Sequence, residues 1–459
     1  MTDSTVTGPL PSPGDATRTA ERRRSSEDAA APRRASRRGF LKKTCLWFVS
    51  LIAPWSSADC RDSPGADDGP VSDAARTGNG GDGAAVDDGG EDDAGLPAPD
   101  GAPVEPGAEP AEDGGADAGN PAAGPLVVRV SSPVVSNWDF SAANYWGLVD
   151  GIAYRRMFDA GLTAVAGTGT TDEAWRKLLT GWRPGDIIAI KPNLNNGLSA
   201  STNLNPLPLT FAMLVDSLKR FGANESDIVV YEAAGSRGFI DYLASAIKAA
   251  FPGVRLLNPP GGGNAALGIG ETSFGTGDPD ETVAYSRSGH PASTVAACLV
   301  NAAHLINVPI LRSHFGGGET LITGALKNHY GSVDIRHHDF QDEDWNPIAE
   351  VNLNPNIRGK TRLVMMEGIF GRFSGGPWGE PQRWKTFPAG TPQSLIFSTD
   401  PVAVDSVGID LILAELDAQG ISPVQHAAQH NADALGIGVH DHARPDGTYS
   451  RLSHVKIVV

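Results

Sequence analysis

Two kinds of hydrophobic pattern alternate along the chain from Leu126 onward. Short, continuously apolar runs are typical of strands buried on both faces, whereas apolar residues that recur about every three to four positions are typical of helices. The predicted strands are 126–130, 186–190, 227–231, 254–257, 304–311, 362–366, 394–398 and 455–459. The predicted helices are 145–160, 172–180, 207–221, 240–251, 402–415 and 424–435.

This alternation predicts an α/β domain with a mostly parallel sheet and helices on both faces. Ligands of such sheets bind at the carboxyl ends of the strands. Polar side chains follow the predicted strands here, namely Lys191, Asn193, Asn195, Asn196, Glu232, Arg312, His314, Glu367 and Asp400. We expect a functional site along this edge. Ordinary surface turns, which also favour Asn, Asp and Gly, are the alternative explanation.

The segment before the predicted domain has a very different composition. Residues 59–124 are almost wholly Ala, Gly, Pro, Asp and Glu and carry a net charge of −15. A segment with so few large apolar side chains cannot offset the entropy of ordering a chain. We therefore predict that it forms a disordered, extended stalk. The domain at 125–459 carries only −7 and shows no clustered basic segment, so nucleic acid is not an expected partner.

Residues 1–58 have the pattern of an export signal. Ser36-Arg37-Arg38-Gly39-Phe40-Leu41-Lys42 matches the twin-arginine motif. The apolar stretch at 44–55 is shorter than the roughly 20 residues that span a bilayer, and it fits a signal-peptide core. Small residues at Ser56 and Ala58 suit cleavage after Ala58. The motif predicts the twin-arginine translocase as a partner and a periplasmic or cell-surface location.

Release by cleavage has one alternative, a lipid anchor at Cys60 at the start of the stalk. Asp59 disfavours it, because small residues are expected before an anchored cysteine. The other cysteines are Cys45 and Cys298, and no CxxC pair occurs. The chain therefore lacks the thiolates of an iron–sulfur cluster, and Cys298 is expected to be a small buried hydrophobe.

A glycine-rich turn follows the predicted strand 304–311, with Gly317 and Gly318 at its centre. We expect a helix from about Glu319, because Ile322, Ala325, Leu326 and His329 form a core-facing stripe. Lys327 and Asn328 fall on another flank of this helix. Free amides at a helix start bind anions, so this turn is a candidate anion site; a plain tight turn is the alternative.

Four histidines lie close together in the sequence, His314, His329, His337 and His338. His329, on the apolar stripe, is expected to be a hydrogen-bonded core residue. His314 and one of His337 and His338 are candidates for metal binding or proton transfer, and Glu367 could complete a divalent metal site. His440-Asp441-His442 could also bind a metal, although such adjacent polar residues usually form a loop.

The run from Asp400 to Asp405 contains two carboxylates with different expected roles. Asp400 precedes a proline and has the position of a helix N-cap. Asp405 lies inside the same helix, where no cap is needed. We expect Asp405 either to pair with a cation or to point into the site.

Together these motifs resemble the domain-of-unknown-function 362 family. The matching pieces are Ile190-Lys191-Pro192-Asn193-Leu194, Leu305-Ile306-Asn307-Val308-Pro309, His314, Thr323-Gly324-Ala325-Leu326-Lys327-Asn328, Gly331, Glu367-Gly368-Ile369, Gly375-Gly376-Pro377 and Asp400-Pro401-Val402-Ala403-Val404-Asp405. Arg312 and Glu367 depart from the family's usual Lys and Asp. The resemblance implies an α/β fold and a shared site without a known reaction. Many relatives are fused to iron–sulfur modules, whose cysteines this chain lacks.

Two functions from different classes follow. The first is an exported enzyme acting on a small anionic substrate with Lys191, His314, Lys327 and Asp405 as catalytic residues. Here the lysines bind charge or act as bases, His314 moves a proton or holds a metal, and Asp405 orients or ligates. Its substrate-binding residues are Asn193, Asn195, Arg312, Gly317, Gly318 and Asn328. The second is a stalked module that captures an anionic ligand without converting it.

Overall fold

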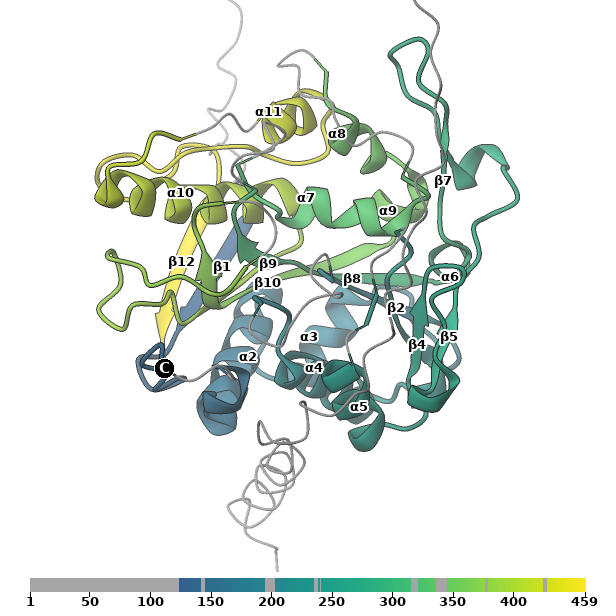
Figure 1. Ribbon diagram of the computed structural model, residues 1–459, viewed down its shortest axis with the longest axis horizontal. Helices are drawn as coiled ribbons and strands as arrows, with labels where there is room; N and C mark the ends of the chain where they lie inside the picture. The colour runs from purple at the N-terminus through teal and green to yellow at the C-terminus, as the bar shows by residue number, and fades with distance from the viewer. Residues whose placement is uncertain are drawn as a thin grey trace, which may run out of the picture. The chain divides into compact units, whose positions relative to one another are not determined.

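The computed structural model describes residues 124–141, 145–194, 203–234, 238–239, 241–314, 321–335, 345–375, 379–423 and 427–459 (Figure 1). The predicted leader and nearly all of the predicted stalk lie outside these ranges. Within them, no helix has both the length and the apolar character that crossing a membrane requires.

Within the described ranges, ten strands form one sheet in the order β12-β1-β11-β10-β8-β2-β3-β4-β5, and β9 pairs with β10. Strand β11 is antiparallel to both of its neighbours, and the other pairings are parallel. The strands are β1 (Leu126–Ser131), β2 (Ile188–Pro192), β3 (Ile228–Tyr231), β4 (Arg255–Asn258), β5 (Ile269–Glu271), β8 (His304–Val308), β9 (Ile310–Arg312), β10 (Thr361–Arg372), β11 (Ser394–Ser398) and β12 (Ser453–Val458). The predicted mostly parallel sheet is confirmed.

Helices cover both faces of the sheet (Figure 1). One layer consists of α2 (Gly151–Ala166), α3 (Thr171–Leu178), α4 (Pro208–Phe221) and α5 (Asp241–Ala250). The other contains α7 (Ala325–Asn328), α8 (Pro347–Val351), α9 (Pro355–Arg358), α10 (Pro401–Gln419) and α11 (Ala427–Ala434), and α6 (Ala297–Val300) lies near β4 and β5. Separate apolar clusters fill the space between the sheet and each layer, which explains why β2, β3, β8 and β11 are buried along their whole length.

The predicted helix 145–160 is in fact two elements. Residues Tyr145–Leu148 form a 3₁₀ turn, and α2 begins after Asp150, whose carboxylate accepts hydrogen bonds from the amides of Ile152 (2.9 Å) and Ala153 (2.8 Å). Because an N-cap side chain satisfies free amides of the first helical turn, it fixes where the helix begins. A two-stranded sheet of β6 (Thr282–Val283) and β7 (Ser293–Thr294), and helices α6, α8 and α9, were not predicted, because elements this short carry no measurable periodicity.

Candidate functional site

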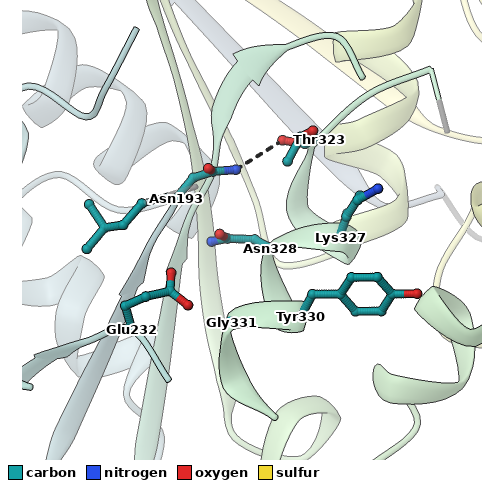
Figure 2. Close-up of a pocket in the computed structure, with 8 residues that line it drawn as sticks. Asn193, Glu232, Thr323, Lys327, Asn328, Tyr330 and Gly331 are labelled. Atoms are coloured by element: carbon teal, nitrogen blue, oxygen red, sulfur yellow. Dashed lines mark hydrogen bonds between the residues drawn. The ribbon is translucent and has the colours of Figure 1, made fainter. Parts of the chain in front are cut away.

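A pocket lies where β2 and β3 end, facing the segment that contains α7 (Figure 2). Its volume is about 280 Å³, counting the part open to solvent. Most of this volume is open solvent, because the space that a water-sized group can enter is only about 20 Å³. That is room for about one water molecule, so only a small group, such as the charged end of a ligand, fits inside. The lining residues are Asn193, Leu194, Glu232, Thr323, Lys327, Asn328, Tyr330 and Gly331. The pocket therefore lies at the strand edge where the sequence predicts a site.

A buried ion pair forms the floor of this region. The Lys191 Nζ atom lies 2.9 Å from Oε2 of Glu232 and 2.8 Å from the Pro192 carbonyl oxygen. The two side chains are 1% and 2% exposed. The other Glu232 oxygen, Oε1, accepts a hydrogen bond from the Ala234 amide (3.1 Å). Removing two charges from water costs several kcal/mol per ion, so a buried pair contributes little net stability.

Gly331 lets the segment after α7 pack directly on this pair. A Cβ atom at Gly331 would lie 2.2 Å from Oε1 of Glu232 and 2.3 Å from Nζ of Lys191. No side chain fits at such distances unless the charged groups move. The short 3₁₀ turn His329–Ser332, which holds Gly331, therefore closes one side of the ion pair.

Buried amide side chains join β2 and β8 to α7. The Asn328 side-chain amide donates to the Lys191 carbonyl (2.9 Å) and to Oδ1 of Asn307 (2.7 Å). Asn307 in turn donates to the Ala325 carbonyl (2.9 Å) and lies 3.1 Å from Nε2 of His329. Burial, together with the charge of Lys191, lowers the pKa of His329 to about 3, so the ring is neutral. His329 is thus the hydrogen-bonded core residue that the sequence predicts.

Arg312 acts behind the pocket wall. It is fully buried at the end of β9, and its Nη2 donates to Oδ1 of Asn193 at 2.5 Å. The amide nitrogen of Asn193 lies 3.4 Å from the Thr323 carbonyl oxygen, the contact dashed in Figure 2. The guanidinium therefore orients Asn193, which lines the pocket, while Arg312 itself does not line it.

Lys327 reaches the pocket from α7. Its ammonium group lies 5.8 Å from the ring centre of Tyr330, and both residues line the cavity (Figure 2). Of the predicted site residues, the structure thus brings together Lys191, Asn193, Arg312, Lys327 and Asn328.

Asp405 has a different position from either predicted one. Its Oδ1 accepts a hydrogen bond from the Ala325 amide (2.5 Å), and Oδ2 accepts from the Leu326 amide and the Gln429 side chain, both at 3.2 Å. A Cβ atom at Gly324 would lie 2.0 Å from Oδ1. Asp405 does not line the pocket and pairs with no cation among the described residues. Its carboxylate instead accepts hydrogen bonds from the first two amides of α7.

The predicted start of this helix, at about Glu319, is wrong. Helix α7 begins only at Ala325, and Ile322 instead forms an isolated β-bridge with Ser313. The predicted stripe is still buried, but it packs from a bent segment instead of a continuous helix. Free amides at a helix start do attract an anion here. That anion is the protein's own Asp405 carboxylate.

Glu367 faces the start of α4. Its carboxylate accepts hydrogen bonds from the Leu207 amide (3.1 Å to Oε2) and from the Thr210 hydroxyl. Burial raises the pKa of Glu367 to about 7. These contacts connect β10 to α4. The expected metal set of His314, His337 and Glu367 stays a prediction, because His337 lies outside the described residues.

His314 is buried just after β9, and its backbone amide donates to the Leu321 carbonyl (3.0 Å). It is not among the residues that line the pocket, so its catalytic and metal roles stay predictions. The predicted residues Asn195, Asn196, Gly317, Gly318, His337 and His338 lie outside the described residues. Cys298 is a partly buried residue of α6, and burial raises the pKa of its thiol to about 11, so it is no ready nucleophile.

Glu232 was expected at the strand edge, but the sequence assigned it no role in the site. Thr323 and Asn307 entered the prediction only through motifs, and Tyr330 was not predicted. Two of them carried a usable signal. Glu232 directly follows an apolar strand, as Lys191 nearly does, and Asn307 is a polar residue inside an otherwise apolar run. Thr323 and Tyr330 carried none, because their position depends on the bend before α7.

A second group of metal-ligating side chains is present among the described residues. One ring nitrogen each from His430, His440 and His442 lies within 4.8 Å of the other two. His430 is on α11, and the other two histidines lie in the loop before β12. None of them lines the pocket.

Comparisons with known proteins agree with the motif reading. No curated protein matches the chain. The lactate racemase apoprotein from Thermoanaerobacterium thermosaccharolyticum is a similar solved structure, at 13% identity and a TM-score of 0.33, over 62% of this chain and 56% of that one. Residues 188–410 match the family described as Domain of unknown function (DUF362). This range holds every residue that lines the pocket, so the match supports placing the pocket-bearing part of the chain in the domain-of-unknown-function 362 family.

Proposed function

We propose that this chain is an exported enzyme that binds a small anionic substrate in the pocket at the ends of β2 and β3. The observation that carries the proposal is the buried Lys191–Glu232 pair beside a cavity lined by Lys327 and two asparagines. His314 and a divalent metal ion remain predicted participants, without a contact that assigns them a step.

The charges around the pocket favour an anion. Among the described residues, Lys191, Arg312 and Lys327 are the cations in or behind the wall, whereas Glu232 is the carboxylate that lines it. Coulomb interactions are stronger in a buried site than in water, so this excess of positive charge attracts a carboxylate or phosphate. The amides of Asn193 and Asn328 add neutral hydrogen-bonding groups.

Glu232 favours an enzyme over a module that only captures its ligand. A carboxylate in the pocket wall repels an anion and therefore weakens its binding. A module that only binds the anion would gain nothing from this carboxylate. Positioned carboxylates commonly donate or accept protons, and Lys191 together with the Ala234 amide holds Glu232 in place. We assign Glu232 the proton transfer, Lys191 the orientation of Glu232, and Lys327 the binding of the substrate's negative charge.

Replacing Lys327 by glutamine is expected to weaken anion binding about 10- to 100-fold, because a hydrogen bond to a charged group contributes about 1.5–3 kcal/mol. The measurement is calorimetric titration of the full chain with inorganic phosphate and with small mono- and dicarboxylates. Lys456→Gln, on the exposed face of β12, is the matched control and should bind as the unaltered chain does.

Equal affinities for Lys327→Gln and Lys456→Gln, or no binding of any of these anions, would remove the pocket assignment. Glu232→Gln then separates the two classes of function. In both classes the anion should bind at least as tightly, because the repelling charge is gone. Only an enzyme should in addition lose turnover of the substrate it accepts.

Export is proposed from the leader motif at Ser36–Lys42, which lies outside the described residues. Replacing Arg37 and Arg38 by lysine should retain the precursor inside the cell, because the arginine pair is what the translocase recognises. Immunoblots of cytoplasmic and exported fractions measure this. Lysine at Arg33 and Arg34, a second pair outside the motif, is the control, and normal export of the Arg37/Arg38 variant would contradict the proposal.

A further inference from the structure

The C-terminal histidines His430, His440 and His442 form a compact cluster. The rings of His430 and His440 have centroids 4.4 Å apart, and those of His440 and His442 are 4.8 Å apart, both edge to face. His430 is exposed on α11, His440 is buried, and the side chain of His442 is 39% exposed. One side of the cluster is therefore open to solvent.

Ser406 determines which nitrogen of His440 carries a proton. The Ser406 hydroxyl lies 3.0 Å from the Val402 carbonyl and 2.9 Å from Nδ1 of His440. With its hydrogen on the Val402 carbonyl, it accepts from Nδ1, and this tautomer leaves the lone pair on Nε2. A neutral imidazole with one defined lone pair is the form that binds a metal.

Asp410 does the same for His442. Its Oδ1 lies 2.7 Å from Nδ1 of His442, while Oδ2 accepts hydrogen bonds from the Ala443 amide (2.8 Å) and the Tyr449 hydroxyl (2.7 Å). Histidines that bind metals almost always donate their second ring nitrogen to a carboxylate or another acceptor of this kind. The Asp410–His442 contact has that arrangement, with Nε2 facing away from the carboxylate.

The backbone of the histidine loop is held before any ligand arrives. Asp400 accepts from the Val439 amide (2.9 Å), Asp433 accepts from the His440 amide (3.1 Å), and Arg451 donates to the His440 carbonyl (3.0 Å). A Cβ atom at Gly438 would lie 2.1 Å from Oδ1 of Asp400, so only glycine allows this close approach. The loop is therefore preorganised against α10 and α11.

We propose that His430, His440 and His442 bind one divalent transition-metal ion, with zinc preferred. Zinc–imidazole bonds of about 2.0–2.1 Å in tetrahedral geometry place the nitrogens about 3.4 Å apart, so the present separations close with small side-chain movements. Imidazole ligands suit zinc, copper and nickel. Three histidines leave a fourth position for water or another ligand, which is the composition of a reactive site more than of a closed structural one. This proposal is independent of the pocket and of its assigned substrate.

The test is zinc binding by the full chain after treatment with a chelator, followed by competition with a chromophoric zinc chelator. The expected result is one more zinc ion per chain in the unaltered protein than in His430→Ala. His430 is exposed, so its loss should leave the folded state intact, which thermal unfolding checks.

Asp410→Asn should keep the zinc stoichiometry but weaken affinity about 10- to 100-fold, the usual effect of removing a partner of a ligating histidine. His454→Ala is the matched control, because His454 lies nearby on β12 but outside the cluster. Zinc binding that is equal in the unaltered chain and in His430→Ala, or absent from both, would overturn the proposal.

Discussion

Replacing Lys191 by methionine is expected to lower the free energy of unfolding by about 3–5 kcal/mol, because the change leaves the Glu232 carboxylate buried without its partner. Both side chains are almost completely excluded from solvent. The stability lost in Lys191→Met should therefore be far larger than the net stability that the intact ion pair contributes. Chemical unfolding followed by circular dichroism measures the difference.

A double variant and an exposed ion pair serve as controls for this prediction. Lys191→Met combined with Glu232→Leu should recover most of the lost stability, because no unpaired charge remains. The Lys219–Glu225 pair is the control, since the Lys219 side chain is 40% exposed and Lys219→Met should cost less than about 1 kcal/mol. A cost for Lys191→Met no larger than that for Lys219→Met would show that the pair is not buried in solution.

Glu367 and Asp405 are expected to lower the free energy of unfolding as the pH rises from about 5 to 8, whereas the lowered pKa values of His329 and His454 act in the opposite direction below about pH 6.5. Burial raises the pKa of each carboxyl group to about 7 in the folded chain, above its ordinary value of 4.5 or 3.8. Below pH 7 the folded state therefore holds protons that the unfolded state has released. The stability from this linkage is present at low pH and is lost through pH 7, on the order of 3 kcal/mol for each group.

Glu367→Gln should reduce this pH dependence, because the amide does not titrate but can still accept hydrogen bonds from Leu207 and Thr210. Unfolding curves at pH 5 and pH 8 measure the effect. Glu271→Gln is a suitable control, since Glu271 is exposed and backbone hydrogen bonds lower its pKa, so it does not titrate in this window. An unchanged difference between the two pH values in Glu367→Gln would contradict the shifted ionisation.

The sheet could be predicted largely from the sequence, because its strands are apolar along their whole length. The predicted strand 394–398 coincides with β11, and 227–231 differs from β3 by one residue. The stripe at Ile322–His329 misled, because burial on one side of a bent segment gives the same spacing as a helix. Periodicity reports which residues are buried and does not report the backbone that buries them.

Site residues that come directly after a strand could be predicted from the sequence. Residues whose role depends on a contact with a distant part of the chain could not. Lys191 and Asn193 come directly from the end of a strand, so the sheet places them. Asp405 has the residue type of a functional carboxylate, and only its contact with α7 shows that it caps a helix. His430 lies on α11 and His440 in the loop that follows this helix. Only the packing of that loop against α11 brings the two rings together.

Strand β12 pairs with β1 in parallel along six consecutive positions, so residues 126–131 and 453–458 depend on each other. In a nascent chain, β1 leaves the ribosome first and must wait for some three hundred later residues before its outer edge is covered. The sheet is accordingly incomplete until residues 453–458 have been synthesised. Any export of the folded domain would therefore have to follow the pairing of β12 with β1.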